Sequence, residues 1–298
     1  MPPPDFLVVG HLVQDKVAEG YRLGGTAVYA SLTAHRLGLR TAILTRVAAD
    51  LDLSSLPPGI DVHRLPSRQT TVFENVYNSG HRTQYVWVRA EPIAAADVPP
   101  ELRAARIVLL GPVVAEVEEE VAPCFPRSLV AISAQGWLRT VAADGRVGQL
   151  SPRQWRPSAS GGLLRHSQAL FVSQEDLPPA ETEETLARWA AQVPILLFTL
   201  GYRGARLSWN NRWQQVPAFP AREVDPTGAG DIFAAAFLAR YLETDDVTQA
   251  SLFAAAAAAV SVEAVGTAGV PSRAQVEERL RRRSEITGSQ TYPGEDQP

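Results

Sequence analysis

Lysine is almost absent from this chain of 298 residues, in which Lys16 is the only example. A Walker A phosphate-binding loop requires Gly-Lys followed by Ser or Thr after a glycine turn, and Lys16 has no such context. The chain is therefore not a P-loop nucleotide-binding protein. Any phosphate that it binds must be met by arginine, backbone amides or a metal ion.

Cysteine, excess positive charge and long apolar runs are also scarce. The single Cys124 excludes an internal disulfide framework and suits a reducing compartment. A formal net charge of -4 offers no basic field for nucleic acid or anionic membranes. The alanine run 254–259 is too short to span a bilayer. We therefore expect a cytoplasmic protein with small-molecule ligands and without nucleic-acid or membrane partners.

The order of the apolar segments indicates an α/β fold. From residue 106 onward, expected strands at 107–111 and 129–133 alternate with helical segments such as 116–121. Such alternation is typical of parallel strands joined by crossover helices. We predict a mostly parallel sheet with helices on both faces, in one domain over residues 1–284, followed by a flexible tail over 285–298.

One segment combines a glycine turn with a carboxylate. Residues 225–231 read Asp-Pro-Thr-Gly-Ala-Gly-Asp, and an alanine-rich run of helix formers follows. The glycines therefore stand at a helix N-terminus, where unpaired amides and the helix dipole attract an anion. A carboxylate there is poorly placed for binding phosphate alone, but it suits a general base, Asp231, beside an anion hole made by the amides of Gly228, Ala229 and Gly230. A capped loop without chemistry is the alternative.

This segment resembles the signature Asp-Thr-x-Gly-Ala-Gly-Asp of the ribokinase-like (PfkB) carbohydrate kinases, with Pro226-Thr227 where Thr-x is commonest. The resemblance implies a ribokinase-like fold with a small β-strand lid. It also implies that Asp231 is the catalytic base, that the Gly-Ala-Gly amides form the anion hole and that Thr227 lies near the nucleotide. ATP and Mg²⁺ are the implied cofactors, and Asp225 lies in the vicinity of a possible monovalent cation such as K⁺.

The N-terminal region supplies candidate acceptor contacts. Asp15 follows the expected strand 6–10, at the sheet edge where open α/β sheets bind ligands, so it is a candidate for substrate hydroxyls or a simple turn residue. Gly24 and Gly25 allow close approach of the backbone to a ligand. They resemble the family's N-terminal Gly-Gly signature. Tyr29 occupies the family's usual Asn position, which disfavours ribose or fructose phosphate as substrate.

A β-hairpin is expected next, because residues 70–78 and 82–88 alternate with period two around Asn-Ser-Gly-His. In the family, strands inserted here form a lid over the sugar site, with Glu74 and Asn75 as the polar residues. We place the lid segments at about 11–25 and 69–90. An exposed lid edge permits either a monomer or a homodimer through the lid.

A Gln-Gly-x-x-Arg loop follows the strand at 129–133 and offers the amide of Gln135 and the guanidinium of Arg139 to the ligand crevice. It is similar to the corresponding element of the myo-inositol kinase branch of the family. Arg139 as a solvated turn residue is the alternative.

The donor side is expected after two later strands. Glu175 matches the family's Asn-x-x-Glu element, which helps to organise Mg²⁺ through water, although Val172 stands where the Asn would be. Residues 199–204 are similar to the family's nucleotide loop, which suggests Thr199, Gly201, Arg203 and Gly204 as nucleotide contacts. The adenine is expected between this loop and the small residues at 256–261.

The sequence thus predicts ATP-dependent phosphorylation of a hydroxyl on a small polyol, most simply a cyclitol such as myo-inositol. A sugar or nucleoside kinase of the same fold is the near alternative, with ribose, fructose, ketodeoxygluconate or a nucleoside as substrate. A non-catalytic sensor that binds a nucleotide or sugar is the third, and intact Asp231 argues against it.

Overall fold

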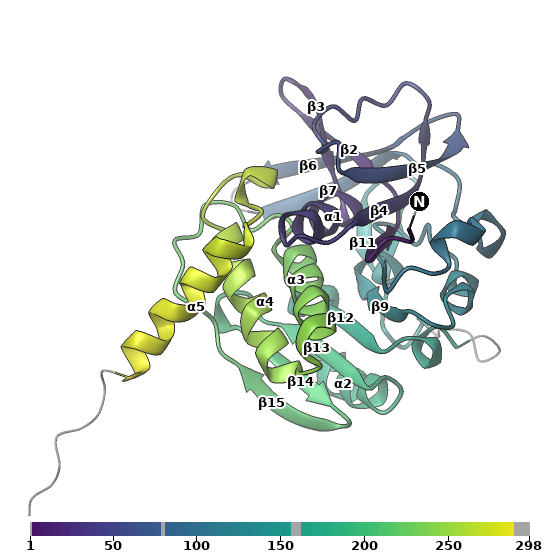
Figure 1. Cartoon of the computed structure of the whole chain (residues 1–298). Helices are drawn as coiled ribbons and strands as arrows, with labels where there is room; N and C mark the ends of the chain where they lie inside the picture. The colour runs from purple at the N-terminus through teal and green to yellow at the C-terminus, as the bar shows by residue number, and fades with distance from the viewer. Residues whose placement is uncertain (1, 79–80, 156–161, 289–298) are drawn as a thin grey trace, which may run out of the picture.

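The computed structural model describes residues 2–78, 81–155 and 162–288. In this part of the chain a nine-stranded sheet forms the centre of the molecule, in the order β15-β14-β13-β12-β9-β8-β1-β4-β5 (Figure 1). The seven strands from β13 to β5 run parallel, while β14 and β15 are antiparallel. The strands are β1 Phe6–Val9, β4 Thr41–Ala48, β5 Ile60–Ser67, β8 Ile107–Leu110, β9 Leu129–Ser133, β12 Ala169–Ser173, β13 Ile195–Thr199, β14 Ala205–Trp209 and β15 Arg212–Val216.

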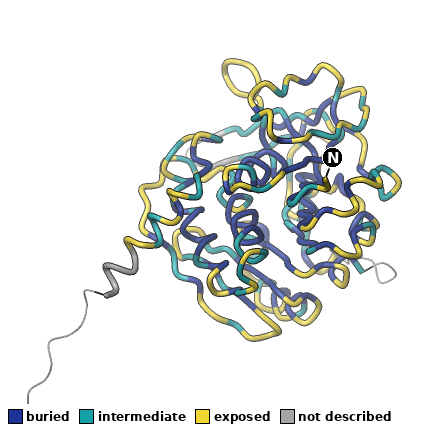
Figure 2. Tube along the Cα trace, viewed as in Figure 1, coloured by how far each residue is buried: buried dark blue, intermediate teal, exposed yellow. Residues whose placement is uncertain are grey.

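Helices cover both faces of this sheet, as the sequence predicted. One face carries α1 Thr26–Arg36, α3 Ala229–Thr244 and α4 Val247–Ser261, with α5 Arg273–Gly288 packed on α4. The other face carries α2 Thr182–Ala190 and short 3₁₀ helices. Alternate residues of β1 belong to different cores, Phe6 and Val8 to one and Leu7 and Val9 to the other. Strands buried on both sides explain the continuous apolar runs in the sequence (Figure 2).

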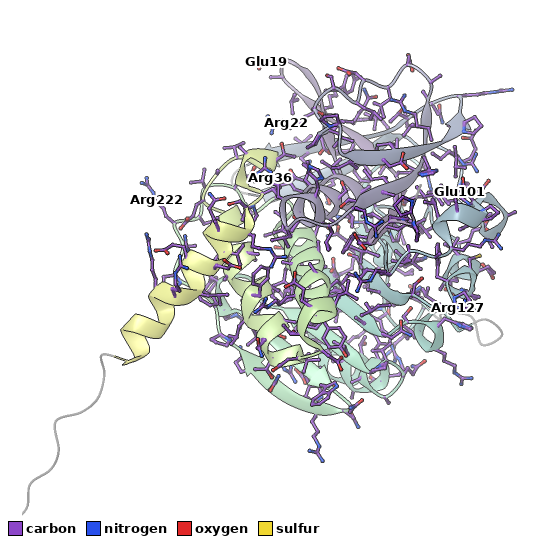
Figure 3. The ribbon with its side chains drawn as sticks, viewed as in Figure 1. Glu19, Arg22, Arg36, Glu101, Arg127 and Arg222 are labelled. Carbon is purple, nitrogen blue, oxygen red and sulfur yellow. The ribbon has the colours of Figure 1, made fainter. Side chains whose placement is uncertain are left out.

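A separate four-stranded sheet, in the order β3-β2-β6-β7, stands over one end of the main sheet and is called the lid below (Figure 1). Its strands are β2 Val13–Val17, β3 Gly20–Gly24, β6 Thr71–Asn78 and β7 His81–Val88. Ser79 and Gly80 of the predicted hairpin turn lie outside the described residues. Glu19 and Arg22 mark the exposed β2–β3 hairpin at the top of the view (Figure 3).

A second hairpin, which the sequence did not predict, extends this lid. It consists of β10 Arg139–Val141 and β11 Val147–Gln149. The amide of Val86 in β7 donates to the carbonyl of Gly145 at 2.8 Å, so the hairpin turn pairs with the lid. Arg139 therefore begins a strand rather than lying in an open loop.

The base of the lid is fixed by a buried histidine. Nδ1 of His11 lies 2.8 Å from Oγ1 of Thr71, and its Nε2 lies 3.0 Å from the carbonyl oxygen of Glu91. Burial lowers the pKa of His11, so the ring is neutral. Three chain segments, before β2, at the start of β6 and after β7, are thereby held together.

Three helix boundaries differ from expectation. A 3₁₀ helix over Glu119–Cys124 replaces the helix expected at 116–121, because Glu116 instead accepts the amides of Val113 and Val114. The sequence predicts a helix over 246–265, but helix α4 ends at Ser261, and the carbonyl of the next residue, Val262, accepts the amide of Asp225. Helix α5 continues to Gly288, and residues 289–298 lie outside the described residues.

Candidate active site

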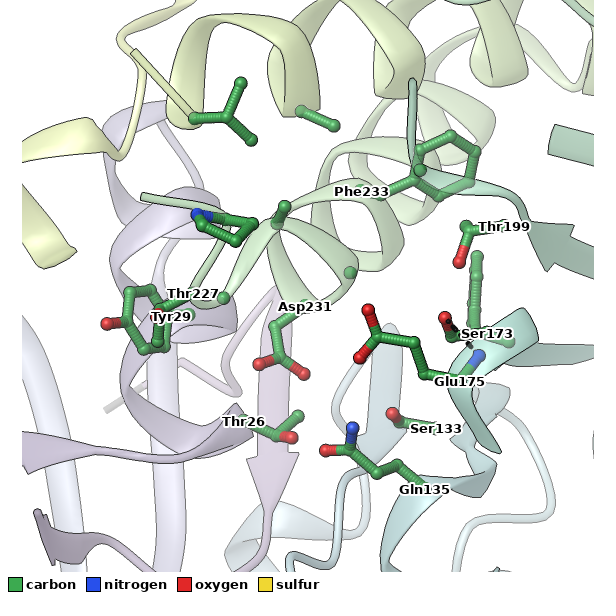
Figure 4. Close-up of a pocket in the computed structure, with 18 of the residues that line it drawn as sticks. Thr26, Tyr29, Ser133, Gln135, Ser173, Glu175, Thr199, Thr227, Asp231 and Phe233 are labelled. Atoms are coloured by element: carbon green, nitrogen blue, oxygen red, sulfur yellow. Dashed lines mark hydrogen bonds between the residues drawn. The ribbon is translucent and has the colours of Figure 1, made fainter. Parts of the chain in front are cut away.

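A cavity of about 530 Å³ lies between the lid, the start of α3 and the ends of β9, β12 and β13 (Figure 4). It brings together most of the candidate site residues. The candidates that line it are Asp15, Gly25, Asn75, Gln135, Arg139, Glu175, Thr199, Gly201, Gly204, Thr227, Gly228, Ala229, Gly230 and Asp231. Four candidates lie outside the lining: Gly24, Glu74, Arg203 and Asp225.

Asp231 occupies the first turn of α3 and points into the cavity (Figure 4). Burial raises the pKa of this carboxyl to about 6. A hydrogen bond from the Thr26 hydroxyl and the positive charge of Arg139 act in the opposite direction, whereas the neighbouring Asp176 raises the pKa further. Near neutral pH the carboxylate is thus ionised but basic enough to accept a proton.

The turn before Asp231 has the expected glycine geometry. Gly228 caps α3 with φ of 78°, and the amide of Ile232 donates to its carbonyl at 2.9 Å. The amide of Ala229, one of the three predicted anion-hole donors, instead donates to the carbonyl of Pro226 at 3.2 Å. The amides of Gly230 and Asp231 belong to the first helical turn, where no intrahelical acceptor exists. The amide of Asp231 is therefore a donor that the sequence analysis left out.

Asp225 supports this turn from outside the cavity. Its Oδ1 accepts the amide of Thr227 at 2.9 Å, and its Oδ2 accepts the amide of Gly266 at 2.8 Å. Burial pushes the pKa of Asp225 upward, but these hydrogen bonds outweigh it, so that the net pKa is lowered. The ionised carboxylate thus ties the 225–231 segment to the late glycine-rich turn Gly266–Gly269.

On the lid side of the cavity, a series of hydrogen bonds connects the lid to the rest of the protein, which is called the body below. Nε2 of Gln84 donates to Oδ1 of Asn75 at 2.8 Å, and Arg139 donates through Nη2 to Oε1 of Gln84 at 3.1 Å. The same guanidinium donates through Nη1 to the carbonyl of Val113 at 2.9 Å. Arg139 is therefore a fixed cation of the cavity wall, not the solvated turn residue of the alternative interpretation.

Glu74 lies on the opposite face of β6 from Asn75. Its carboxylate accepts the indole N–H of Trp87 at 2.7 Å and lies 3.1 Å from Nζ of Lys16. The structure therefore does not bring Glu74 to the cavity, contrary to the sequence prediction. Alternation along a strand is the reason, since two consecutive residues cannot share a face.

Asp176 is a cavity residue that the sequence analysis missed. It follows Glu175 in a 3₁₀ turn and is buried, with the amide of Ser173 donating to its Oδ2 at 2.8 Å. Burial raises its pKa, against hydrogen bonds from Ser173 and Gln135 and the charge of Arg139. The available signal was a second carboxylate directly after the expected one.

At the end of the cavity where the sequence predicts the nucleotide, called the donor end below, a glycine turn faces apolar side chains. Gly201 and Gly204 have φ of 59° and 87°, and the amide of Leu200 donates to the carbonyl of Gly204 at 2.7 Å. Arg203 bonds Gln174 instead of entering the cavity. Opposite this turn lie apolar residues that leave room for a flat ring: Phe219, Ala255, Ala258, Ala259 and Val262.

For a divalent cation, the described residues contain no preformed cluster of three or more His, Cys, Asp or Glu side chains. Glu175 and Asp176 nevertheless offer carboxylates to the same cavity. This set fits Mg²⁺, which usually takes one or two protein carboxylates and completes its shell with water and substrate phosphates. In the described part of the chain, none of the helices has the length and apolar character needed to cross a bilayer.

Comparison with known proteins agrees with the cavity chemistry. The profile of the pfkB family of carbohydrate kinases matches residues 138–273. This range includes Arg139 and the whole 225–231 segment, but not Gln135. Inositol 3-kinase of Zea mays is 29% identical over 95% of this chain and 80% of its own length. The chain is thus similar to the ribokinase-like (PfkB) carbohydrate kinases, whose profile covers a little under half of it.

Other relatives within the family differ in the substrate that their names give. Ribokinase of Bacillus subtilis is 36% identical, but the match spans only 44% of this chain and 45% of that enzyme. Among solved structures, a pyrophosphate-dependent kinase of the ribokinase family, complexed with a pyrophosphate analog and myo-inositol, superposes with a TM-score of 0.74. It is 22% identical and covers 92% of this chain and 99% of its own. At that identity the likeness concerns the fold, which confirms the predicted ribokinase-like architecture.

Proposed function

We propose that this protein transfers a phosphoryl group from ATP to a hydroxyl of a small neutral polyol, with a cyclitol such as myo-inositol as the favoured acceptor. The observation that carries the proposal is the position of Asp231, which faces the cavity from the first turn of α3, between the donor turn and the polar lid residues. A base in this position abstracts the proton of an acceptor hydroxyl. The amides at the helix start stabilise the charge of the transferring group.

The charge of the cavity supports a neutral acceptor. Among the described lining residues there is one guanidinium, that of Arg139, against five carboxyl groups. The carboxyl groups belong to Asp15, Glu175, Asp176, Glu223 and Asp231. An acceptor that already carries phosphate would meet net negative charge, whereas hydroxyls find both donors and acceptors. Sugar phosphates are therefore poor acceptors in this proposal.

The polar residues of the acceptor side support a ring with several hydroxyls. Amide groups of Asn75 and Gln135 and the carboxylate of Asp15 converge on the cavity from the lid and from the end of β9. Amides donate and accept, so they suit alcohol groups of either orientation. The name of the Zea mays relative, inositol 3-kinase, points to the same class of acceptor.

The apolar slot at the donor end favours ATP over pyrophosphate. Pyrophosphate has no group that would use the surface of Phe219, Ala255 and Ala258, whereas an adenine ring buries it. When bound, Mg²⁺ would neutralise phosphate charge, and Glu175 and Asp176 are the carboxylates that would hold it through water. A monovalent cation near Asp225 remains part of the proposal.

The test is a matrix of donors and acceptors. Purified protein with Mg²⁺, with or without K⁺, is given ATP or pyrophosphate together with myo-inositol, ribose, fructose, fructose 6-phosphate, 2-keto-3-deoxygluconate or a nucleoside. The expected result is turnover with ATP and myo-inositol. Turnover with pyrophosphate alone contradicts the donor assignment, and turnover on another acceptor alone contradicts the cyclitol assignment while leaving the role of Asp231 intact.

A sugar or nucleoside kinase is the second candidate, favoured by the match to a ribokinase over 44% of this chain. Tyr29 disfavours ribose as the acceptor, because its buried ring occupies the position of the family's usual Asn. A sensor without catalysis is the third candidate. It predicts that calorimetry detects nucleotide binding and that no combination of donor and acceptor gives a phosphorylated product.

A further inference from the structure

The first turn of α1 places two side chains against the start of α3. Thr26 and Tyr29 are three residues apart, so they lie on the same face of the helix. Both are buried, at 2% and 4% exposure, and α1 packs directly on α3. Neither residue carries a role in the reaction described so far.

Thr26 contacts the base itself. Its hydroxyl acts on the carboxylate of Asp231, whose pKa it lowers, and Figure 4 shows Thr26 next to Asp231 on the wall of the same cavity. Its methyl group packs on the end of β8, since a Cβ placed on Gly111 would lie 2.3 Å from Cγ2 of Thr26. The rotamer of Thr26 is thus fixed by the sheet, and the hydroxyl direction is fixed with it.

Tyr29 contacts the anion-binding turn. A Cβ placed on Gly228 would lie 2.3 Å from Cδ1 and 2.4 Å from Cγ of the Tyr29 ring, so the ring lies directly against the backbone of this turn. The hydroxyl end reaches the second turn that Asp225 fixes, 3.8 Å from where a Cβ on Gly266 would stand. A flat, buried ring in this place prevents the glycine turn from collapsing away from the cavity.

We propose that the first turn of α1 is the positioning element of this site: Thr26 orients the carboxylate of Asp231, and Tyr29 supports the backbone of Gly228 at the anion hole. The inference rests on the proposed phosphoryl transfer. Both residues act through their neighbours, and the proposal applies whichever polyol is the acceptor. Alignment of the base and of the transferring group to within about 1 Å is worth as much as 10²-fold in rate, which gives these contacts their weight.

The Thr26 half is tested with Thr26→Val and Thr26→Ser. Valine keeps the shape and removes the donor, so kcat is expected to fall roughly 10- to 100-fold while KM for donor and acceptor stays within about twofold. Serine keeps the hydroxyl and is expected to recover most of that loss. Thr33→Val is the matched control, because Thr33 is a buried threonine of the same helix whose hydroxyl bonds the helix carbonyl of Tyr29.

The Tyr29 half is tested with Tyr29→Phe and Tyr29→Leu. Phenylalanine keeps the ring against Gly228 and is expected to stay within about threefold of the parent kcat, whereas leucine is expected to lose about tenfold or more. Binding provides a readout independent of turnover. Leucine is expected to weaken binding of the non-hydrolysable donor AMP-PNP, or of methylenediphosphonate if pyrophosphate is the donor, while binding of adenosine is unchanged.

Several outcomes overturn the inference. A Thr26→Val enzyme with parental kcat, a Thr26→Ser enzyme as slow as valine, or a Tyr29→Leu protein that weakens adenosine and AMP-PNP equally each removes one half of it. Unfolding temperatures of all variants identify losses that come from the fold alone, which also count against it. If the parent protein shows no turnover at all, the proposed function fails, and the phosphate-binding comparison still decides the role of Tyr29.

Discussion

Arg139 Nη2 lies 3.1 Å from Oε1 of Gln84, so a guanidinium at the start of the β10–β11 hairpin holds a side chain of the lid strand β7. The same group bonds the carbonyl of Val113, and its charge acts on both Asp176 and Asp231. The position of Gln84 and the pKa values of Asp176 and Asp231 therefore all depend on Arg139.

We expect Arg139→Lys to raise KM for the acceptor about tenfold and to lower kcat, because lysine cannot reproduce the two-pronged contact. Loss of the guanidinium also removes the hydrogen bond that holds Gln84 of the lid. Steady-state kinetics with the acceptor varied checks this. Arg146→Lys, an exposed arginine on the adjoining β11 hairpin, is the control and should behave as the parent. Equal kinetics for both variants would remove Arg139 from the acceptor site.

We expect Asp231→Asn to reduce kcat by roughly 10²- to 10⁴-fold while nucleotide binding is retained, because the amide keeps the shape of the side chain but cannot accept the proton. Calorimetry with AMP-PNP and a rate assay on the same preparation check both parts. Intact turnover in this variant would refute the assigned base.

The raised pKa of Asp231 predicts the pH dependence of both rate and stability. The rate should fall below about pH 6, as the base becomes protonated. Because the folded-state pKa of about 6 exceeds the ordinary value of 3.8, the folded protein holds this proton more tightly than the unfolded chain does. The free energy of unfolding therefore declines as pH rises from about 4 to 6, and the penalty is complete above that range.

Asp231→Asn removes this penalty. Relative to the parent, the variant should gain as much as about 3 kcal/mol in free energy of unfolding between pH 4 and pH 7.5. Urea denaturation of both proteins at the two pH values measures the difference. A gain that is the same at pH 4 and 7.5 would mean that the carboxyl titrates normally.

At the donor end, Ala258→Phe should fill the apolar slot and raise KM for ATP at least about tenfold. Ala258→Ser, which changes the volume little, is the matched control. If the phenylalanine variant keeps the parental KM for ATP, the adenine lies elsewhere in the cavity. Use of pyrophosphate, if the enzyme accepts it, should not change in either variant.

On the lid, Asn75→Leu should raise KM for the acceptor, whereas Glu74→Gln should not. The two residues are adjacent in β6, but Asn75 lines the cavity and Glu74 binds Trp87 and Lys16 on the other face. The pair forms its own control, and a larger effect from Glu74→Gln would show that the lid strand is turned over in solution.

The sequence predicted correctly that Asp231 and the glycine turn lie together at the start of a helix, because one continuous segment contains both and local geometry suffices to place them. The role of Asp231 as the base stays a prediction. The alternation of side chains in β6 could also be seen in the sequence. Because consecutive residues of a strand point to opposite faces, it would have placed Glu74 and Asn75 on different faces of the lid. Thr26 could not be found in this way, since its partner Asp231 is 205 positions further along the chain and only the packing of α1 on α3 joins them. Asp176 was obscured by Glu175 because both carboxylates fit the same local pattern. The β10–β11 hairpin was missed because its strands have three residues each.

Lys16, which pairs with Glu74 between β2 and β6, is one of two residues that can be labelled selectively in this protein. Lys16 is the only lysine and Cys124 the only cysteine, the first on the lid and the second on a 3₁₀ helix of the body. Apart from the α-amino group, an amine-reactive dye and a thiol-reactive dye therefore label one site each, on two parts joined by the His11 region. Energy transfer between the dyes would therefore report whether the distance between lid and body changes when substrates bind to the unmutated protein.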